Sequence, residues 1–277
     1  GLMALGLATL PVALAAQGLD ALAASPGTLL QATTWQAGLA SSFGRSAMIA
    51  GAALLLGLAS LKIPGRAGAA AAIAALTGSG LALAASGHAG AAEPRGLMLS
   101  AVFLHGFGLA GWAGALLPLA LSLRGPGSTE ALRRFSRRIP FLLLAVLASG
   151  LVLAIVQVET PGALLDTAYG LVLSAKLALV AALLALAGFN RYRLTLPARL
   201  GREAEAALLR RMIGVEVAIV LTVLASAALW RFTPPPRARV AASARPASAH
   251  IHGEKAMADI SIAPGQTGPV TISISLL

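Results

Sequence analysis

Residues 139–158 read IPFLLLAVLASGLVLAIVQV and contain no charged side chain. A helix of about 20 apolar residues is as long as the hydrocarbon core of a bilayer is thick. The rest of the chain has the same character, because 57% of its 277 residues are apolar and only 11% are charged. A soluble domain carries roughly 25% charged residues. The composition therefore predicts an integral membrane protein.

Seven apolar segments are candidates for membrane-spanning helices. They are Leu2–Ala16, Ser46–Leu61, Ala67–Ser86, Leu97–Leu123, Ile139–Val158, Gly170–Phe189 and Met212–Trp230. The first is the shortest, and the chain begins with Gly rather than Met, so we expect a piece to be missing at this end. We predict an all-α transmembrane bundle of about seven spans, with small residues that allow close helix packing.

The net charge of +11 comes mostly from basic residues in alternate loops. Lys and Arg gather in residues 62–66, 124–138 and 191–211, whereas the intervening loops carry mainly acidic residues and His. The positive-inside rule places the basic loops in the cytoplasm. This predicts a cytoplasmic N-terminus and an outer tail after Trp230, although four arginines on that tail count against it. This distribution of basic residues indicates the orientation of the spans in the membrane and argues against nucleic-acid binding.

The C-terminal tail has a different composition from the bundle. Three prolines, Pro234–Pro236, end the last apolar segment. Apolar residues then alternate with polar ones in residues 258–262 and 270–276, on either side of a Pro-Gly turn. Two strands alone are marginal in water, so we expect the beginning of a small outer β-sandwich. The predicted domains are a membrane domain at 1–232, a linker at 233–249 and a partial β domain at 250–277.

Two segments of the sequence resemble each other. Ser25–Leu30 reads SPGTLL and Thr160–Leu165 reads TPGALL, and an aromatic-glycine pair opens the next span in both cases, Phe43-Gly44 and Tyr169-Gly170. Both copies fall in outer loops, which is typical of the parallel repeats of transporters. A chance match in Ala- and Leu-rich sequence is the alternative.

His105 is the deepest ionisable side chain of the predicted spans, and such groups are usually functional. Met98 and Trp112 lie seven residues before and after it, two helical turns away, and share its face. His88 lies at the outer end of the preceding span. Because imidazole and thioether are copper ligands, we interpret His88, Met98 and His105 as a copper site. A hydrogen-bonded His105 and a Met98 that only packs are the structural alternatives.

Lys176 and Glu216 are the other ionisable groups inside the predicted spans. Lys176 could snorkel outward or pair with a carboxylate of the preceding loop. Glu216 lies near the inner surface, and we favour an ion pair with Arg138 or Arg191. The chain has no Cys, which excludes a thiolate metal site and a Cys nucleophile. A chain that offers only Met and His can bind copper weakly enough to release it.

The predicted β domain opens with His250-Ile251-His252. Residues i and i+2 of a strand point to one face, so two imidazoles there could hold one metal ion. Met257 or Asp259 could supply a third ligand. The alternative is a polar strand edge with two histidines that bind nothing.

Several of these motifs resemble the CopD copper-resistance family of bacterial inner-membrane proteins. The most specific part runs from Tyr169-Gly170 and Lys176 to Phe189-Asn190-Arg191. The segments Ser86–Ala89 and His105–Trp112 fit the same family, as does Glu216, and the likeness covers roughly Ser46–Trp230. The tail from His250 to Val270 resembles the YtkA-like or FixH-like periplasmic module fused to some members.

The resemblance implies copper transport or delivery at the bacterial inner membrane, often beside the periplasmic copper carrier CopC. It marks His88 and His105 as functional positions, and Lys176, Asn190, Arg191 and Glu216 as further polar residues of the membrane domain. We expect no enzymatic activity. Copper, as Cu(I) or Cu(II), would be captured at His250 and His252 and passed inward.

Two other functions stay open at the level of sequence. A haem-bearing electron carrier would need two facing histidines at membrane depth, and only His105 is clearly deep. An assembly factor could hand copper to a copper enzyme without transporting it, and the sequence does not separate that role from transport.

Overall fold

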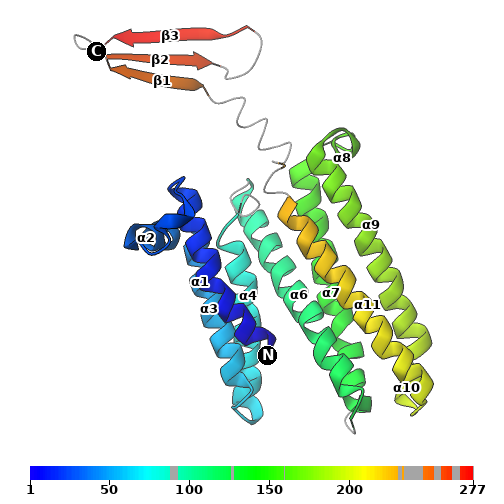
Figure 1. Cartoon of the computed structure of the whole chain (residues 1–277). Coiled ribbons are helices and arrows are strands. Elements are labelled where there is room, and N and C mark those ends of the chain that lie inside the picture. The colour runs from blue at the N-terminus through cyan, green and yellow to red at the C-terminus, as the bar shows by residue number, and fades with distance from the viewer. Residues whose placement is uncertain are drawn as a thin grey trace. The chain divides into compact units, whose positions relative to one another are not determined.

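The computed structural model describes residues 1–87, 93–125, 128–158, 160–229, 233, 246–252, 257–263 and 269–276 (Figure 1). The α-helices are α1 (Leu2–Ala21), α2 (Ala32–Ala40), α3 (Ser42–Ser60), α4 (Gly65–Ala84), α6 (Arg95–Ser122), α7 (Ser128–Val158), α8 (Ala163–Asp166), α9 (Ala168–Phe189), α10 (Thr195–Arg199) and α11 (Glu203–Ala228). The 3-10 turn η1 (Pro26–Thr28) precedes α2, and the π-helical segment η2 (Asn190–Leu194) joins α9 to α10.

Among the described residues, six helical segments are long and apolar enough to cross a membrane. They are α1, α3, α4, α6, α7 and the continuous segment Ala168–Arg199. They correspond to six of the seven predicted spans, and these helices fit a mostly helical, multi-pass membrane protein. The seventh predicted span falls in α11 and stays a prediction, because Glu203, Glu205, Arg210 and Arg211 occupy the first part of this helix.

The chain divides into two compact units, residues 1–154 with 183–220, and residues 155–182 with 221–277. In the first unit, α3 packs against α1, α2 and α4, and α4 packs against α6. A buried apolar cluster of this unit joins α6 to α7, the end of α9, η2 and α11. Its buried members are Trp112, Leu116, Leu119, Leu123, Leu132, Leu183, Leu194, Leu209, Ile213 and Val220.

Glycines on α6 allow α7 to approach closely. A β-carbon at Gly108 would lie 2.8 Å from Cγ2 of Val146, and one at Gly111 would lie 2.9 Å from Cδ1 of Leu142. Both distances are shorter than a van der Waals contact. At Gly108 the carbonyl oxygen of Leu142 would also lie at 2.9 Å, so a side chain does not fit there, whereas at Gly111 the end of the Leu142 side chain would have to move. α6 and α7 are therefore in close contact at these two positions. No described atom lies within 4 Å of the corresponding point at Gly114, which does not contribute.

The side chain of Ser41 caps the N-terminus of α3. Its Oγ accepts a hydrogen bond from the backbone N–H of Gly44 at 3.1 Å and donates one to the carbonyl oxygen of Gly38 at 2.6 Å. This is the N-cap arrangement that serine favours. A β-carbon at Gly44 would overlap the carbonyl oxygen of Leu39, so only glycine fits.

The side chain of Thr167 caps the N-terminus of α9 in the same way. Oγ1 of Thr167 accepts from the N–H of Gly170 at 2.9 Å and donates to the carbonyl oxygen of Ala163 at 2.6 Å. A β-carbon at Gly170 would overlap that same carbonyl oxygen. The starts of α3 and α9 thus share a hydroxyl cap with glycine three residues after it, whereas the two similar sequence segments differ, since residues 25–30 contain the 3-10 turn η1 and residues 160–165 contain the start of α8.

The second unit contains a three-stranded antiparallel sheet in the order β1-β2-β3. Its strands are β1 (Ala247–His252), β2 (Met257–Ala263) and β3 (Thr271–Leu276). β2 and β3 correspond to the two predicted strands, and Ile260 pairs with Ile274 across them. β1 contains His250 and His252, which were expected on a strand, and begins three residues earlier, inside the predicted linker. The β-sandwich beyond this sheet stays a prediction.

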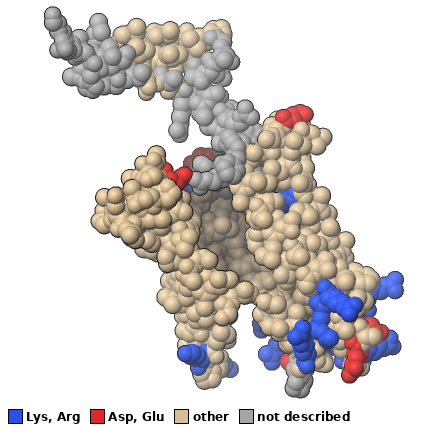
Figure 2. Space-filling view, in the orientation of Figure 1, with Lys and Arg blue, Asp and Glu red and all other residues tan. Residues whose placement is uncertain are grey.

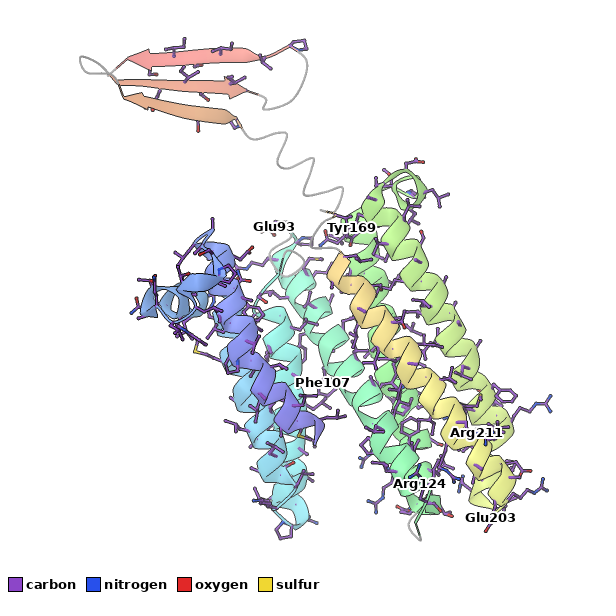
Figure 3. All side chains as sticks on the ribbon, in the orientation of Figure 1. Glu93, Phe107, Arg124, Tyr169, Glu203 and Arg211 are labelled. Carbon is purple, nitrogen blue, oxygen red and sulfur yellow. The ribbon has the colours of Figure 1, made fainter. Side chains whose placement is uncertain are left out.

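Most charged residues of the first unit gather at one end of its helices (Figure 2). The exposed basic residues of the loops predicted to be cytoplasmic include Lys62, Arg66, Arg124, Arg133, Arg134, Arg137, Arg138, Arg191, Arg193 and Arg211. Arg133 and Arg134 both form ion pairs with Glu130, with Nε–O distances of 2.7 and 2.5 Å. Glu93 lies at the opposite end of the helices from Arg124 and Arg211 (Figure 3). This separation is the pattern on which the predicted orientation rests.

Candidate functional site

His105 lies on α6 and is held by α7. Its Nδ1 lies 3.1 Å from the carbonyl oxygen of Val146 and 3.2 Å from Oγ of Ser149. The side chain is half-buried, and Gly150 lies directly against the ring. The structural alternative, a histidine hydrogen-bonded to a neighbouring helix, is therefore present.

The hydrogen bonds of Ser149 determine which nitrogen of His105 carries the proton. The hydroxyl has one proton, and Oγ lies 2.5 Å from the carbonyl oxygen of Ala145, the shortest of its contacts. Oγ therefore acts as an acceptor toward His105, as the Val146 carbonyl must. Both neighbours require a proton on Nδ1, which leaves the lone pair of a neutral imidazole on Nε2. A histidine whose Nδ1–H donates to a backbone carbonyl is the usual form of a metal ligand.

Met98 and Trp112 are packed into the interior of the first unit. Met98 is 0% exposed and Trp112 is 4% exposed, and Trp112 belongs to the buried apolar cluster described above. The two side chains share the helix of His105, and the burial of Trp112 has an explanation in the packing of this cluster. The role of Met98 as a copper ligand stays a prediction.

The described ranges contain no cluster of three or more His, Asp or Glu side chains placed to hold a metal ion. His88 lies outside the described residues. The backbones of His250, His252 and Met257 are described, but their side chains are not. The register of the sheet pairs His250 with Asp259 and His252 with Met257. The residues predicted to form the tail site are thus neighbours along the ladder.

Glu216 of α11 forms a buried polar pair with Asn190 of η2. Nδ2 of Asn190 donates to Oε1 of Glu216 at 2.8 Å. Asn190 is 5% exposed and Glu216 is 4% exposed. The predicted ion pair of Glu216 is not formed: Arg191 donates instead through Nη1 to the carbonyl oxygen of Ser136 at 2.7 Å, and Arg138 is exposed.

Lys176 lies on α9 in the second unit and is half-buried. Tyr169, which begins the motif on which the family resemblance rests, is buried near the start of the same helix. Both residues therefore belong to the second unit, whereas His105 and the residues of α7 that hold it belong to the first.

Sequence reasoning missed three residues that hold His105, namely Val146, Ser149 and Gly150. The signal was available, because Ser149-Gly150 interrupts an otherwise aliphatic span at residues 139–158. Asn190 was noted through the family resemblance, but not as the partner of Glu216. That pairing joins two residues 26 positions apart and depends on the π-helical turn between α9 and α10.

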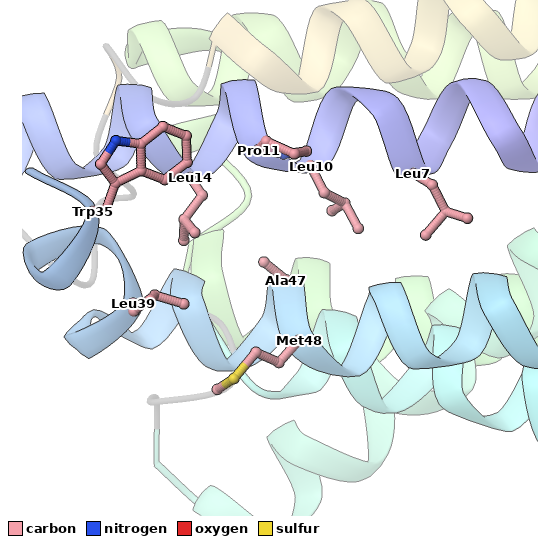
Figure 4. Close-up of a pocket in the computed structure, with 8 residues that line it drawn as sticks. All are labelled: Leu7, Leu10, Pro11, Leu14, Trp35, Leu39, Ala47 and Met48. Atoms are coloured by element: carbon pink, nitrogen blue, oxygen red, sulfur yellow. The ribbon is translucent and has the colours of Figure 1, made fainter. Parts of the chain in front are cut away.

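An apolar cavity of about 330 Å³ lies between α1, α2 and α3 (Figure 4). Its lining residues are Leu7, Leu10, Pro11, Leu14, Trp35, Leu39, Ala47 and Met48. The indole N–H of Trp35 donates to the carbonyl oxygen of Leu29 at 2.8 Å, so little polar character faces the cavity. The predicted metal-site residues do not line it, and it offers no set of copper ligands.

Residues 129–230 match the family model described as copper resistance protein D, or CopD. The matched region runs from the start of α7 beyond the end of α11. It contains the residues of α7 that hold His105, together with Lys176, Asn190 and Glu216, but His105 itself lies before it. The match relates this region to membrane proteins of copper resistance. No curated protein and no solved structure matched the chain.

Proposed function

We propose that this chain is a copper-handling protein of the bacterial inner membrane, and that His105 binds the copper that it moves or delivers. The observation that carries the proposal is the orientation of the imidazole by Val146 and Ser149, whose acceptor oxygens favour the proton on Nδ1, so that in a neutral imidazole the lone pair is on Nε2. The match of residues 129–230 to the CopD family supplies the choice of metal.

The chemistry of the site supports copper over harder metal ions. Imidazole accepts both Cu(I) and Cu(II), and thioether favours Cu(I), whereas Mg²⁺ and Ca²⁺ require oxygen ligands. A neutral histidine adds no charge of its own to an apolar segment. Met98 and His88 would complete the coordination, with Met98 reached only if its tightly packed surroundings open.

The C-terminal tail supports a copper-binding site on the outer side of the membrane, where the ion would first be bound. His250 and His252 lie on β1, and the adjacent strand contributes Met257 and Asp259 opposite them in the register. We place this tail in the periplasm, where a carrier resembling CopC could deliver copper. The ion would then pass from His250 and His252 to His88 and His105.

Copper uptake into proteoliposomes tests this proposal and separates transport from delivery. We expect uptake by the wild type and its loss in His105→Ala, with Gly114→Ala as a control on the same helix. No described atom lies within 4 Å of the point that a β-carbon on Gly114 would occupy, so this substitution should change nothing. Copper binding without uptake would favour a delivery factor, and no binding at all would refute the proposal.

An optical spectrum of the purified protein tests the haem alternative. A b-type haem would give a Soret band, and His105→Ala would remove it. We expect no such band, with or without the substitution, and we expect copper to bind to the same preparation.

A further inference from the structure

Glu216 lies in an apolar environment in the first unit. On α11 it shares a face with Leu209, Ile213 and Val220, at helical spacings of three, four and seven residues. All three belong to the buried apolar cluster, and Glu216 is itself 4% exposed. A carboxylate in such surroundings has lost most of its hydration, and burying a charge without a partner is costly.

Asn190 compensates only part of this loss. Its Nδ2 donates one hydrogen bond to Oε1 of Glu216 at 2.8 Å. Its Oδ1 is buried and has no hydrogen-bond partner in the described protein. The pair therefore brings together a carboxylate and an amide oxygen, both acceptors, with one donor between them. Buried acceptors without donors are rare in folded proteins and call for an explanation.

The local backbone is built to place Asn190 there. Asn190 begins η2, a single π-helical segment, and its own carbonyl oxygen accepts a hydrogen bond from Oγ1 of Thr195 at 2.9 Å. Single π-helical turns inside α-helices occur frequently at functional sites. The wider turn costs regular hydrogen bonding, so its presence at the partner of a buried carboxylate favours a role for the pair.

No basic group in the described residues neutralises Glu216. Arg133 and Arg134 pair with Glu130, and Arg202 pairs with Glu205. Arg191 and Arg210 are bound to the carbonyl oxygens of Ser136 and Leu123, respectively. The other titratable groups on α7, η2, α10 and the adjoining part of α11 are Arg133, Arg134, Arg137, Arg138, Tyr192, Arg193, Arg199 and Arg211, all exposed except the half-buried Arg199. Residues 183–189 contain no titratable side chain, and α6 contributes only Arg95 and His105.

We propose that Glu216 and Asn190 form a proton-binding site, in which Glu216 accepts the Nδ2 hydrogen bond through one oxygen and donates its own proton to Oδ1 of Asn190. A carboxylic acid and a primary amide are complementary in this way, because each can use one donor and one acceptor in the pair. One proton on the acid removes the buried charge and gives Oδ1 its missing donor. The site goes beyond copper handling and does not depend on it, since its ligand is a proton.

Infrared difference spectroscopy on the full chain in lipid nanodiscs tests this site without any copper. A protonated carboxyl has a C=O stretch that is separate from those of carboxylates and amides and that shifts in D₂O. We expect this band at neutral pH in the wild type and its loss in Glu216→Gln. Glu205→Gln is the matched control, because Glu205 lies on the same helix and pairs with Arg202. This variant should keep the band.

Asn190→Leu tests the contribution of the amide. Loss of both hydrogen bonds should move the band to the higher frequency of an isolated acid, while the band itself remains. A wild type without the band at any pH at which it stays folded would overturn the site, as would a band that survives in Glu216→Gln. If Na⁺ or K⁺ abolished the band at constant pH, the site would take an alkali cation, and the assignment to a proton would be wrong.

Discussion

A β-carbon on Gly150 of α7 would lie 3.2 Å from Cε1 and 3.4 Å from Nδ1 of His105 on α6. The imidazole therefore lies against a backbone that has no side chain at this point. The carbonyl and hydroxyl acceptors of Val146 and Ser149 reach Nδ1 from the same helix. The position of His105 is thus defined by a short stretch of α7, residues 146–150, and this stretch lies in the part of the chain that matches the CopD family.

We predict that Gly150→Ala displaces the imidazole and weakens copper binding. The added methyl group must push the ring by a few tenths of an ångström, which lengthens both Nδ1 hydrogen bonds. Overpacking of this kind costs about 1–3 kcal/mol of stability, and loss of a partner that orients a ligand costs about 10–100-fold in metal affinity. Copper titration and thermal unfolding would measure the two effects. Equal copper affinity in Gly150→Ala and Gly114→Ala would contradict the account of His105.

The two hydroxyl-capped turns give a prediction about stability. Gly44→Ala and Gly170→Ala should each destabilise the protein, because the added β-carbon would overlap a carbonyl oxygen, that of Leu39 or Ala163. Gly188→Ala, where no described atom lies within 4 Å, should be neutral or stabilising by up to about 1 kcal/mol. Melting temperatures in detergent would compare the three variants. Wild-type stability in Gly170→Ala would show that the turn before α9 is not as described.

We predict that the C-terminal tail binds one copper ion through His250 and His252. The double variant His250→Ala/His252→Ala should lose one bound copper per chain in equilibrium dialysis, since two imidazoles of one strand would no longer share an ion. Ser248→Ala, on the same strand, is the control and should bind as the wild type does. An unchanged stoichiometry in the double variant would place the outer site elsewhere.

The orientation is testable by fusion of topology reporters. Alkaline phosphatase fused after Pro236 should be active, and the same fusion after Gly125, in the basic loop between α6 and α7, should be inactive. The reason is the gathering of Lys and Arg at one end of the helices, which the positive-inside rule assigns to the cytoplasm. The reverse pattern of activity would invert the orientation and the proposed direction of copper capture.

Composition and spacing predict the helices of this chain well, because a span of about 20 apolar residues has no stable alternative in a bilayer. Residues 139–158 predict the apolar part of α7 without further information. The case of α11 is different, since its charged first part and Glu216 lower the apolar signal of a helix that is otherwise regular. Length and composition alone therefore do not decide whether α11 crosses the membrane as a seventh span.

Side-chain partners in the membrane domain were harder to predict than helices. Charge complementarity favoured an arginine for Glu216, but the partner is Asn190, which a π-helical segment turns toward α11. Arg191, the neighbour of Asn190, turns to the carbonyl oxygen of Ser136. Helical periodicity assumes 3.6 residues per turn, and one wider turn changes which side chain faces inward. The start of β1 was placed three residues too late for another reason, because its first residues carry the Ala and Ser of a typical linker.

Thermal unfolding of the wild type and His105→Ala, with and without Cu(I), tests the central claim most directly. Copper bound at His105 should raise the stability of the wild type, by about 2.7 kcal/mol at a free copper concentration about 100 times the Kd. In the background of His250→Ala/His252→Ala, the shift should persist, and adding His105→Ala should abolish it. No copper-dependent shift in that background, or an equal shift with and without His105, would contradict the account and leave His105 with a structural role alone.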